Sequence, residues 1–396
     1  MGAIPRYTVK KSKIQLAIEI CLWAGKVPLI IGSPAVGKSA TVHYIAKQDN
    51  ALLVDIRLAG FQESDINGIP QFVPVFNIIK DGQKVKVGDR TVFTPLDIFK
   101  FKQLDTEEDA LLKVDEKGEP ILNAKGEKQY YDYIYYFLDE YTSAAEEVVA
   151  ATYSLILDRK IGQYDLLDCC QLILAGNKVT DNAIANDITT AIMSRVVLLE
   201  YEPNFNEWCE HFAYENIDYR IIAYLNFRAK SFYNFEGLPN VQFAAPRTWD
   251  TCSGIMQEIE QRQISLTDDV SNDLLKGCVG KVADDFILFT KHYLELPSAK
   301  EIYDNPSSIQ LPSSNDMSKR YALSTLIASV VINNFKSLNK NDEKTKQIMQ
   351  LVQDLGNEAA SVVLKNIIVV VKTAFSNRII FDVYRKMVKD SDVEVI

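Results

Sequence analysis

The sequence predicts an α/β fold in which a parallel β-sheet lies between helices and is followed by a region built of helices. Three observations lead to this prediction. Before Pro203, short apolar runs of strand length alternate with helix-forming sequence, which is typical of a parallel sheet with helices on both faces. The first apolar run continues through a glycine-bounded turn directly into a helix. After Pro203 the strand signals fade and apolar residues recur at helical spacing.

Five apolar runs are expected to form the sheet. They are residues 27–31, 51–58, 134–138, 171–175 and 195–201. A helix over residues 13–25 precedes the first run, because its apolar residues fall at helical spacing and Gly25 supplies a stop. A second helix begins at Lys38, directly after the glycine-bounded turn.

The stretch between the second and third expected strands departs from this alternation. Its turn signals are Asp81-Gly82, Glu116-Lys117-Gly118 and Ala124-Lys125-Gly126, separated by short alternating segments such as 84–87 and 91–93. These signals are typical of β-hairpins, so we expect an inserted pair of hairpins or a mobile loop around residues 71–130. A plain surface excursion accounts for the same pattern equally well.

Helical patterns dominate the rest of the chain. They cover residues 219–232, 248–262, 270–277, 321–336, 343–355 and 358–374. A Pro- and Ser-rich stretch over residues 305–314 interrupts them and reads as a linker. We therefore expect an αβα core over residues 1–202, a helical lid over 203–300 and a C-terminal helical region over 301–396.

Composition limits the classes of function. The 396 residues include 43 Lys and Arg against 53 Asp and Glu, a formal charge of −10, which argues against a whole surface that grips nucleic acid. Six cysteines are too sparse for a disulfide framework, and three scattered histidines do not suggest a metal site. The adjacent Cys169 and Cys170 are interpreted as small buried apolar residues in preference to a redox pair.

The N-terminus lacks the pattern of a signal peptide, because its apolar stretch contains Glu19 and ends without a small-residue cleavage site. The longest apolar runs fall far short of the ~18 residues that a membrane span requires. We therefore expect a cytoplasmic protein with no membrane segment.

The strongest motif follows the first expected strand. The residues Gly32-Ser33-Pro34-Ala35-Val36-Gly37-Lys38-Ser39 fit the phosphate-loop pattern G-x-x-x-x-G-K-[ST], and Ala40 continues into the helix. The glycines allow successive N–H groups to cradle phosphate oxygens, and the new helix adds its positive end. Lys38 is expected to neutralise the β- and γ-phosphates of ATP, and the Ser39 hydroxyl is expected to bind Mg²⁺.

Two adjacent carboxylates end the third expected strand. An apolar run leads into Asp139 and Glu140. Carboxylates at the end of a buried strand cost free energy unless they are paired, so their presence suggests a functional role. In an ATPase, Asp139 would hold the Mg²⁺ shell while Glu140 orients and deprotonates the attacking water. Taken alone, an Asp-Glu pair also starts many helices, so the phosphate loop upstream is what gives this pair its meaning.

Three further polar residues occur at suggestive places. Asn177 follows the fourth expected strand, where an amide could hydrogen-bond the attacking water or the γ-phosphate, although a simple turn residue fits as well. Arg195 precedes the last strand and Arg247 begins a helix, and an arginine can offset charge on a transferring phosphoryl group. Taken singly, an arginine in either position is more often a surface residue.

The order of these motifs resembles an AAA+ ATPase, and within that superfamily it resembles the MoxR group. The resemblance extends beyond the nucleotide motifs, is specific over residues 10–255 and is looser toward the C-terminus. The segments that carry it are Val54-Asp55-Ile56-Arg57-Leu58, Asp65 through Gly68-Ile69-Pro70, Asp139-Glu140-Tyr141-Thr142-Ser143-Ala144, Leu157-Asp158-Arg159-Lys160-Ile161-Gly162, Ala175-Gly176-Asn177 and Ala245-Pro246-Arg247-Thr248-Trp249. The resemblance implies an AAA+ P-loop NTPase core with a helical lid and a C-terminal helical extension.

The resemblance also implies roles for these residues. It assigns Lys38 and Ser39 to Walker A, and Asp139 and Glu140 to Walker B. It further assigns Asn177 as the first sensor, Arg195 as an arginine finger that reaches the neighbouring subunit's nucleotide, and Arg247 as the second sensor in cis. Arg159 competes with Arg195 for the trans role. The stretch from Gly68 to Tyr133 is longer than the family pattern leads us to expect. The residues that form the pore loops and substrate-facing loops are therefore not assigned.

A finger that acts in trans implies a homo-oligomeric ring, with a hexamer expected and ATP at the subunit interfaces. MoxR-type ATPases resemble chaperones that remodel or assemble a protein partner, often one with a von Willebrand factor A (VWA) domain. Two alternatives stay open at this point. One is a nucleic-acid motor or loader built on the same core, and the other is an ATP-dependent scaffold with little turnover.

Overall fold

The computed structural model describes residues 12–78, 84–178, 186, 188–238, 240–266, 268–371 and 373–390. The chain forms two compact units, Met1–Glu202 and Pro203–Ile396, and each is described by itself. Over these described ranges, no helix combines the length and the apolar character needed to cross a membrane.

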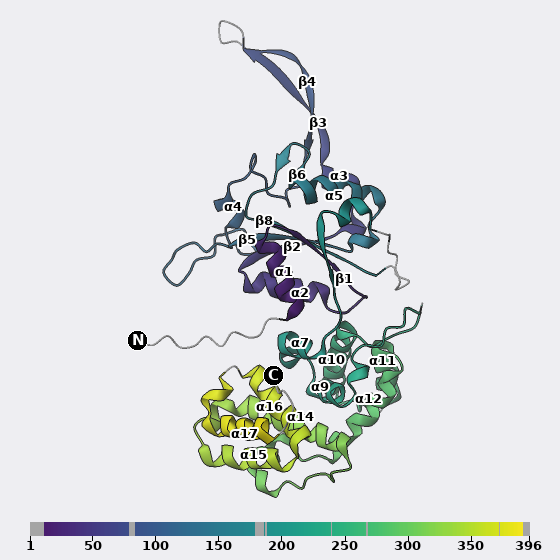
Figure 1. The fold of residues 1–396 in the computed structure, drawn as a ribbon, viewed down its shortest axis with the longest axis vertical. Helices are drawn as coiled ribbons and strands as arrows, with labels where there is room; N and C mark the ends of the chain where they lie inside the picture. Colours follow the sequence, from purple (N-terminus) through teal and green to yellow (C-terminus); the bar gives the residue numbers. More distant parts are fainter. Residues whose placement is uncertain are drawn as a thin grey trace. The chain divides into compact units, whose positions relative to one another are not determined.

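The first unit is built on a five-stranded sheet (Figure 1). Its strands are β1 (Val27–Ile31), β2 (Ala51–Arg57), β5 (Tyr133–Asp139), β8 (Cys170–Gly176) and β9 (Val196–Glu200). The order across the sheet is β2-β5-β8-β1-β9, and every neighbouring pair is parallel. The predicted strands are confirmed to within a residue or two at each end. All carboxyl ends therefore meet at one edge, where the motif residues follow the strands.

Helices cover both faces of this sheet. In Figure 1, α1 (Lys13–Trp23) and α2 (Lys38–Gln48) lie on one side, and α5 (Glu146–Asp158) lies on the other. A capping box starts α1, since the Ser12 hydroxyl accepts from the Gln15 N–H at 3.2 Å and the Gln15 side chain accepts from the Ser12 N–H at 3.3 Å. This arrangement confirms the predicted α/β class.

The insertion contains one long hairpin made of β3 (Ile69–Ile78) and β4 (Lys84–Thr94), which are antiparallel and extend away from the sheet (Figure 1). The predicted Asp81-Gly82 turn lies outside the described residues. At the base of the hairpin Gly68 has a φ of +85°, and a Cβ there would lie 2.5 Å from the Thr94 carbonyl oxygen. The two strands are therefore held close together where they leave the core.

The other two predicted turns pair through isolated bridges, without forming regular strands. Val114 bridges Pro120 around the first turn, and Leu122 bridges Lys128 around the second. Gly118 and Gly126 take φ values of +81° and +82° at these turns, which only glycine adopts readily. The described part of the insertion thus holds one full hairpin and two short bridged turns. The helix α3 (Glu63–Asn67) precedes the hairpin, and α4 (Glu107–Leu111) lies between the hairpin and the two turns. Neither helix was expected from the sequence. A two-residue hairpin, β6 (Lys160–Ile161) with β7 (Tyr164–Asp165), follows α5.

The described part of the second unit consists of helices and turns, in agreement with the prediction. Its helices are α7 (Phe205–Trp208), α8 (Tyr214–Asn216), α9 (Tyr219–Phe227), α10 (Pro246–Gln261), α11 (Asp269–Val279), α12 (Val282–Lys291), α13 (Ala299–Asp304), α14 (Met317–Leu338), α15 (Asp342–Asp354), α16 (Asn357–Val370) and α17 (Arg378–Asp390). One apolar cluster surrounds Trp249, and another lies between α14 and α16. The Pro/Ser stretch lies inside this unit, because Ile309 and Leu311 pack against the second cluster. The predicted helix over 219–232 ends early, at Phe227, and no predicted range covers α12 or α17.

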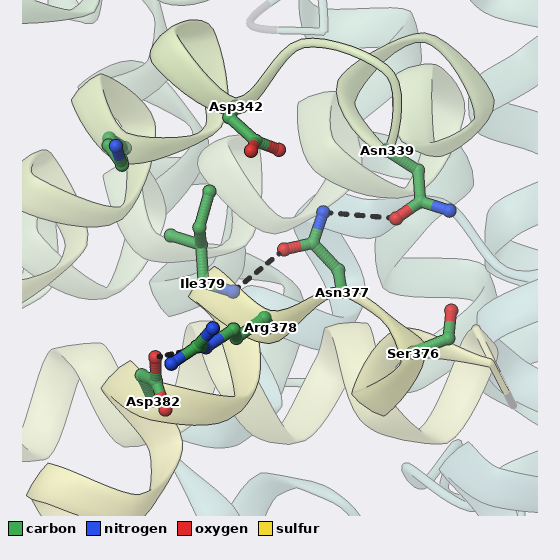
Figure 2. A pocket seen from close by; sticks show the side chains of 8 residues that line it. Asn339, Asp342, Ser376, Asn377, Arg378, Ile379 and Asp382 are labelled. Atoms are coloured by element: carbon green, nitrogen blue, oxygen red, sulfur yellow. Dashed lines mark hydrogen bonds and ion pairs between the residues drawn. The ribbon is translucent and has the colours of Figure 1, made fainter.

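A polar cavity of about 500 Å³ lies beside the start of α17 (Figure 2). The Asn377 side chain accepts from the N–H groups of Ile379 at 3.0 Å and Ile380 at 3.3 Å, and donates to the Asn339 side chain at 3.1 Å. Arg378 and Asp382, which also line the cavity, are 3.8 Å apart. Asn377 therefore caps α17 and ties it to the end of α14.

Candidate nucleotide-binding site

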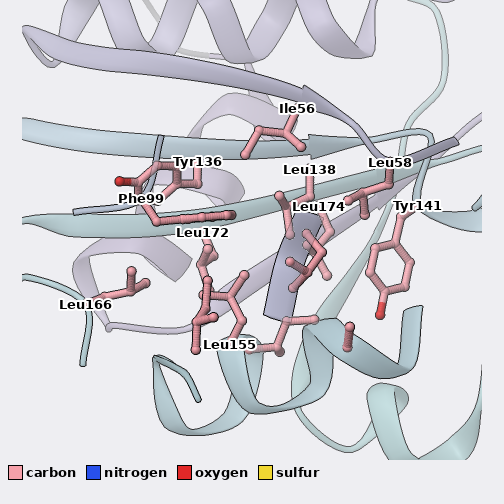
Figure 3. Close-up of a cluster of buried hydrophobic side chains, with 14 of the residues drawn as sticks. Ile56, Leu58, Phe99, Tyr136, Leu138, Tyr141, Leu155, Leu166, Leu172 and Leu174 are labelled. Carbon is pink, nitrogen blue, oxygen red and sulfur yellow. The ribbon is translucent and has the colours of Figure 1, made fainter. Parts of the chain in front are cut away.

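Buried apolar strands hold the candidate site in place (Figure 3). Leu138 on β5 and Leu174 on β8 are fully buried, and Leu29 on β1 belongs to the same cluster. Fixing three neighbouring strands in one core fixes the backbone at their carboxyl ends. The polar residues that follow β1, β5 and β8 therefore stand on a rigid edge.

The loop after β1 has the backbone of a phosphate cradle. Ala35 and Gly37 take φ values of +60° and +107°, in the left-handed region. Gly32 packs so closely on Tyr201 that a Cβ would lie 2.7 Å from the Tyr201 carbonyl oxygen. Gly37 then starts α2 without a side-chain cap, and the N-terminus of a helix is a favourable place for an anion such as phosphate.

Two hydrogen bonds join this loop to the neighbouring strands. The Lys38 Nζ donates to the Asn177 Oδ1 at 3.0 Å, and the Ser39 hydroxyl donates to the Asp139 Oδ2 at 2.8 Å. Lys38 also donates to the carbonyls of Gly32 at 2.6 Å and Ser33 at 2.9 Å, so its ammonium group stays over the loop. The structure thus brings together four residues that the sequence singled out, from β1–α2, β5 and β8.

Glu140 has an unusual backbone. Its φ of +58° is in the left-handed region, which costs a non-glycine residue about 1–2 kcal/mol. Its N–H donates to the Asp139 Oδ1 at 2.8 Å, and its carbonyl accepts from the Ser143 N–H at 2.9 Å. Strain held by surrounding contacts is common at functional sites. The turn therefore fixes the two carboxylate residues relative to each other.

The three arginines lie in different settings. Arg195 donates to the Ala191 carbonyl at 2.9 Å, at the end of α6 (Thr190–Met193). Arg159 donates to the carbonyls of Leu167 at 3.0 Å and Cys170, so its guanidinium is committed to its own subunit's backbone. Arg247 is exposed in the first turn of α10, in the second unit.

Sequence reasoning missed the supporting roles of Thr142 and Tyr201. The Thr142 hydroxyl bonds to both backbone groups of Asn177, and the Tyr201 hydroxyl lies 2.8 Å from the Thr41 Oγ1 in α2. Tyr201 ends an apolar run and Thr142 follows the Asp-Glu pair, so position was the only available signal. Neither residue belongs to a phosphate-loop pattern.

Burial and hydrogen bonding shift the pKa values of several groups in the first unit. Desolvation raises the pKa of Tyr141 to about 12, and its hydrogen bond with Thr152 opposes this rise only in part. A hydrogen bond with Cys169 and burial together raise the pKa of the Cys170 thiol, which keeps that thiol neutral, while the same hydrogen bond lowers the pKa of Cys169. All six cysteines are free.

The donor set fits a magnesium ion held in part by a nucleotide. Among the described residues, no cluster of three or more His, Cys, Asp or Glu side chains could enclose a metal ion. Mg²⁺ typically takes one or two protein oxygens and completes its shell with phosphates and water. The adjacent Ser39 hydroxyl and Asp139 carboxylate match that requirement.

Comparison with known proteins gave structural matches only. No family model and no curated protein sequence matches the chain. Among solved structures, the chain is similar to RuvB from Thermotoga maritima, described as a Holliday junction branch migration motor, with 14% identity over 74% of this chain and 75% of that one and a TM-score of 0.29. Two RuvB point mutants from the same organism match at 14% identity. One has a TM-score of 0.32 over 74% of this chain and 75% of that one, and the other has 0.29 over 97% and 89%.

These similarities are too low to support an argument about function. The sheet order β2-β5-β8-β1-β9, the phosphate loop after β1 and the helical second unit together give a parallel α/β fold with a phosphate loop after its first strand and a helical C-terminal part.

Proposed function

We propose that this chain is a Mg²⁺-dependent ATP hydrolase of the MoxR AAA+ type, which works as a ring and remodels or assembles a protein partner. The observation that carries the proposal is the meeting of Lys38, Ser39, Asp139 and Asn177 at one edge of a parallel sheet. Ligands of α/β proteins bind at this edge, where the strand order reverses.

The loop from Gly32 to Ala40 would hold the phosphates of ATP. The N-terminus of α2, which begins without a side-chain cap, would direct its helix dipole at the phosphates, and the Lys38 ammonium supplies a positive charge. Because Lys38 already spans the loop carbonyls and Asn177, a γ-phosphate would replace weak neutral acceptors with a charged one. A bound Mg²⁺, held by Ser39 and Asp139, would neutralise charge on the β- and γ-phosphates.

Glu140 would act as the general base. It takes a proton from water as the water oxygen bonds to the γ-phosphorus, and the bond from that phosphorus to the β–γ bridging oxygen breaks. The products are ADP and phosphate. Asn177 would orient the water or the γ-phosphate through its amide N–H groups, since its Oδ1 already accepts from Lys38.

Two arginines are proposed to offset the negative charge on the transferring phosphoryl group. Arg195 is the proposed finger in trans and Arg247 the proposed second sensor in cis. The two backbone hydrogen bonds of the Arg159 guanidinium favour Arg195, because Arg159 would have to abandon both to reach a neighbour. Activity of a finger in trans requires a ring, with a hexamer as the expected size.

The decisive experiment compares wild-type protein with Glu140→Gln. This change removes the base while keeping the shape of the side chain, so ATP affinity should stay within about threefold, whereas phosphate release should fall by about 100-fold or more. Glu147→Gln is the matched control, since Glu147 is exposed in the first turn of α5. Equal phosphate release from wild-type and Glu140→Gln proteins would show that Glu140 is not the general base, and no phosphate release from the wild-type protein would show that the chain is not an ATPase.

A second experiment distinguishes protein remodelling from the nucleic-acid alternative. The chain carries ten more acidic than basic residues, which favours a protein partner, and we propose a VWA-domain protein as that partner. ATP turnover should rise with a VWA-domain partner protein, and should change little with single-stranded DNA. Strong stimulation by DNA alone would favour the motor or loader function.

A further inference from the structure

One buried hydroxyl joins the turn after β5 to the residue after β8. Thr142 is 3% exposed, and its Oγ1 accepts from the Asn177 N–H at 2.9 Å and donates to the Asn177 carbonyl at 3.3 Å. Because β8 ends at Gly176, the backbone groups of Asn177 have left the sheet ladder and need other partners. A single side chain bonds to both of them.

The close approach of Thr142 depends on the glycine before Asn177. A Cβ on Gly176 would lie 2.6 Å from the Thr142 Cγ2 and 2.8 Å from its Oγ1, well inside normal contact. On its other side, the Thr142 carbonyl accepts from the Asn186 N–H at 2.6 Å. Thr142 is therefore fixed at both its side chain and its backbone.

Thr142 also belongs to the turn that carries Glu140. The 3₁₀ turn Tyr141–Ser143 is closed by the hydrogen bond from the Ser143 N–H to the Glu140 carbonyl at 2.9 Å. A shift of Thr142 would therefore move Glu140 as well as Asn177. The hydroxyl is the direct polar connection between the turn of the proposed base and the backbone of the proposed sensor amide.

We propose that Thr142 is a positioning residue that holds the Asn177 amide in register with Glu140. This inference rests on the proposed ATPase function. A base and an orienting amide must both reach the same water at about 3 Å, and a misplacement of about 1 Å can cost up to 100-fold in rate. Thr142 acts on the rate through Asn177, without contacting the reacting atoms itself.

The kinetic test uses a conservative series at this position. Thr142→Val and Thr142→Ala remove the hydroxyl and should lower kcat about tenfold, which corresponds to about 1.4 kcal/mol, while KM for ATP stays within about threefold. Thr142→Ser keeps the hydroxyl and should restore kcat to within about threefold of wild type. Thr345→Val is the control, because Thr345 is equally buried and donates to the Leu338 carbonyl at 2.8 Å in the second unit.

A second measurement does not depend on hydrolysis. The Asn177 N–H should exchange with deuterium at least about tenfold faster in Thr142→Val than in wild type or Thr142→Ser, since it loses its acceptor. Unchanged exchange, unchanged kcat in both hydroxyl-free variants, or no rescue by Thr142→Ser would each overturn the inference. Wild-type protein that hydrolyses no ATP would overturn the inference together with the proposed function, whereas faster exchange in that case would still establish the contact.

Discussion

The Tyr201 hydroxyl lies 2.8 Å from the Thr41 Oγ1, and so connects the end of the sheet to the helix that follows the phosphate loop. Gly32 packs closely against the Tyr201 carbonyl oxygen. The Tyr201 N–H also donates to the Ile31 carbonyl at 2.7 Å. Both ends of the phosphate loop therefore rest on one residue. A loop held in its binding shape before the ligand arrives loses less entropy on binding.

Removing this hydroxyl should weaken nucleotide binding. Tyr201→Phe deletes one hydrogen bond worth about 0.5–1.5 kcal/mol, so the Kd for ATP should rise about threefold to tenfold. Fluorescent ATP analogues can measure this change. Tyr153→Phe is the matched control, because Tyr153 pairs with Thr189 at 2.9 Å on the exposed side of the same unit. An equal effect of both changes would contradict a specific role for Tyr201.

Loss of the loop lysine should abolish nucleotide binding. Lys38→Ala removes the only charged group placed over the loop carbonyls in the described residues, so we expect the Kd for ATP to rise by about 100-fold or more. Lys47→Ala, an exposed lysine of the same helix, should leave the Kd unchanged. Calorimetric titration with ATP and Mg²⁺ would measure both. Tight ATP binding by the Lys38→Ala protein would rule out this loop as the site.

The glycine beside Thr142 should tolerate no side chain. Gly176→Ala places a Cβ 2.6 Å from the Thr142 Cγ2, and such overpacking typically costs about 1–3 kcal/mol of the free energy of unfolding. Gly254→Ala is the opposite case, since Gly254 lies within α10 with open space around its Cβ position. That change should stabilise the second unit by up to about 1 kcal/mol. Thermal unfolding of the two variants should shift in opposite directions.

Rings that mix two inactive variants should show whether Arg195 acts on the nucleotide of a neighbouring subunit. Subunits with Arg195→Ala and subunits with Lys38→Ala should each be inactive alone. Mixing them creates interfaces that pair an intact finger with an intact loop, so part of the ATPase activity should return. Light scattering during the titration would show whether a ring is present. Absence of recovery at every mixing ratio, with rings formed, would argue against a trans role for Arg195.

Alkaline pH should destabilise the first unit. Burial raises the folded-state pKa of Tyr141 to about 12, above its ordinary value near 10. A raised pKa means that the folded state binds the proton more tightly, so this contribution to stability is complete below pH 10 and is lost between pH 10 and 12. Tyr141→Phe should show a shallower loss over that window in unfolding experiments. An unchanged slope would show that Tyr141 does not ionise on unfolding in this range.

Much of the fold could be predicted because its signals are local. Apolar runs such as residues 171–175 are strand-sized and can only be buried, and the phosphate-loop pattern sets the order of strand, turn and helix. The helix α17 was missed although Ile380, Val383 and Met387 are buried at helical spacing and charged residues occupy much of the rest of the helix, which is the pattern of an amphipathic helix. The early end of α9 at Phe227 arises from the backbone of Arg228, whose φ of −122° no local signal indicated.

The contacts of the candidate site likewise include some that the sequence predicts and some that it does not. The meeting of Lys38 with Asn177 could be expected, because both follow neighbouring parallel strands. The contact of Thr142 with Asn177 could not, since it depends on how closely the turn after β5 approaches β8 at Gly176. Such distances are set by packing between segments far apart in the sequence. The roles of these residues in catalysis stay predictions until the variants are measured.

The hairpin of β3 and β4 has a mechanical consequence. Its strands are ten and eleven residues long, and its base is pinched where Gly68 meets Thr94. At about 3.3 Å per residue it is a lever of roughly 30 Å, so a rotation of about 10° at the base would displace the far end of its strands by about 5 Å. Small movements of the core are thereby converted into displacements larger than a side chain.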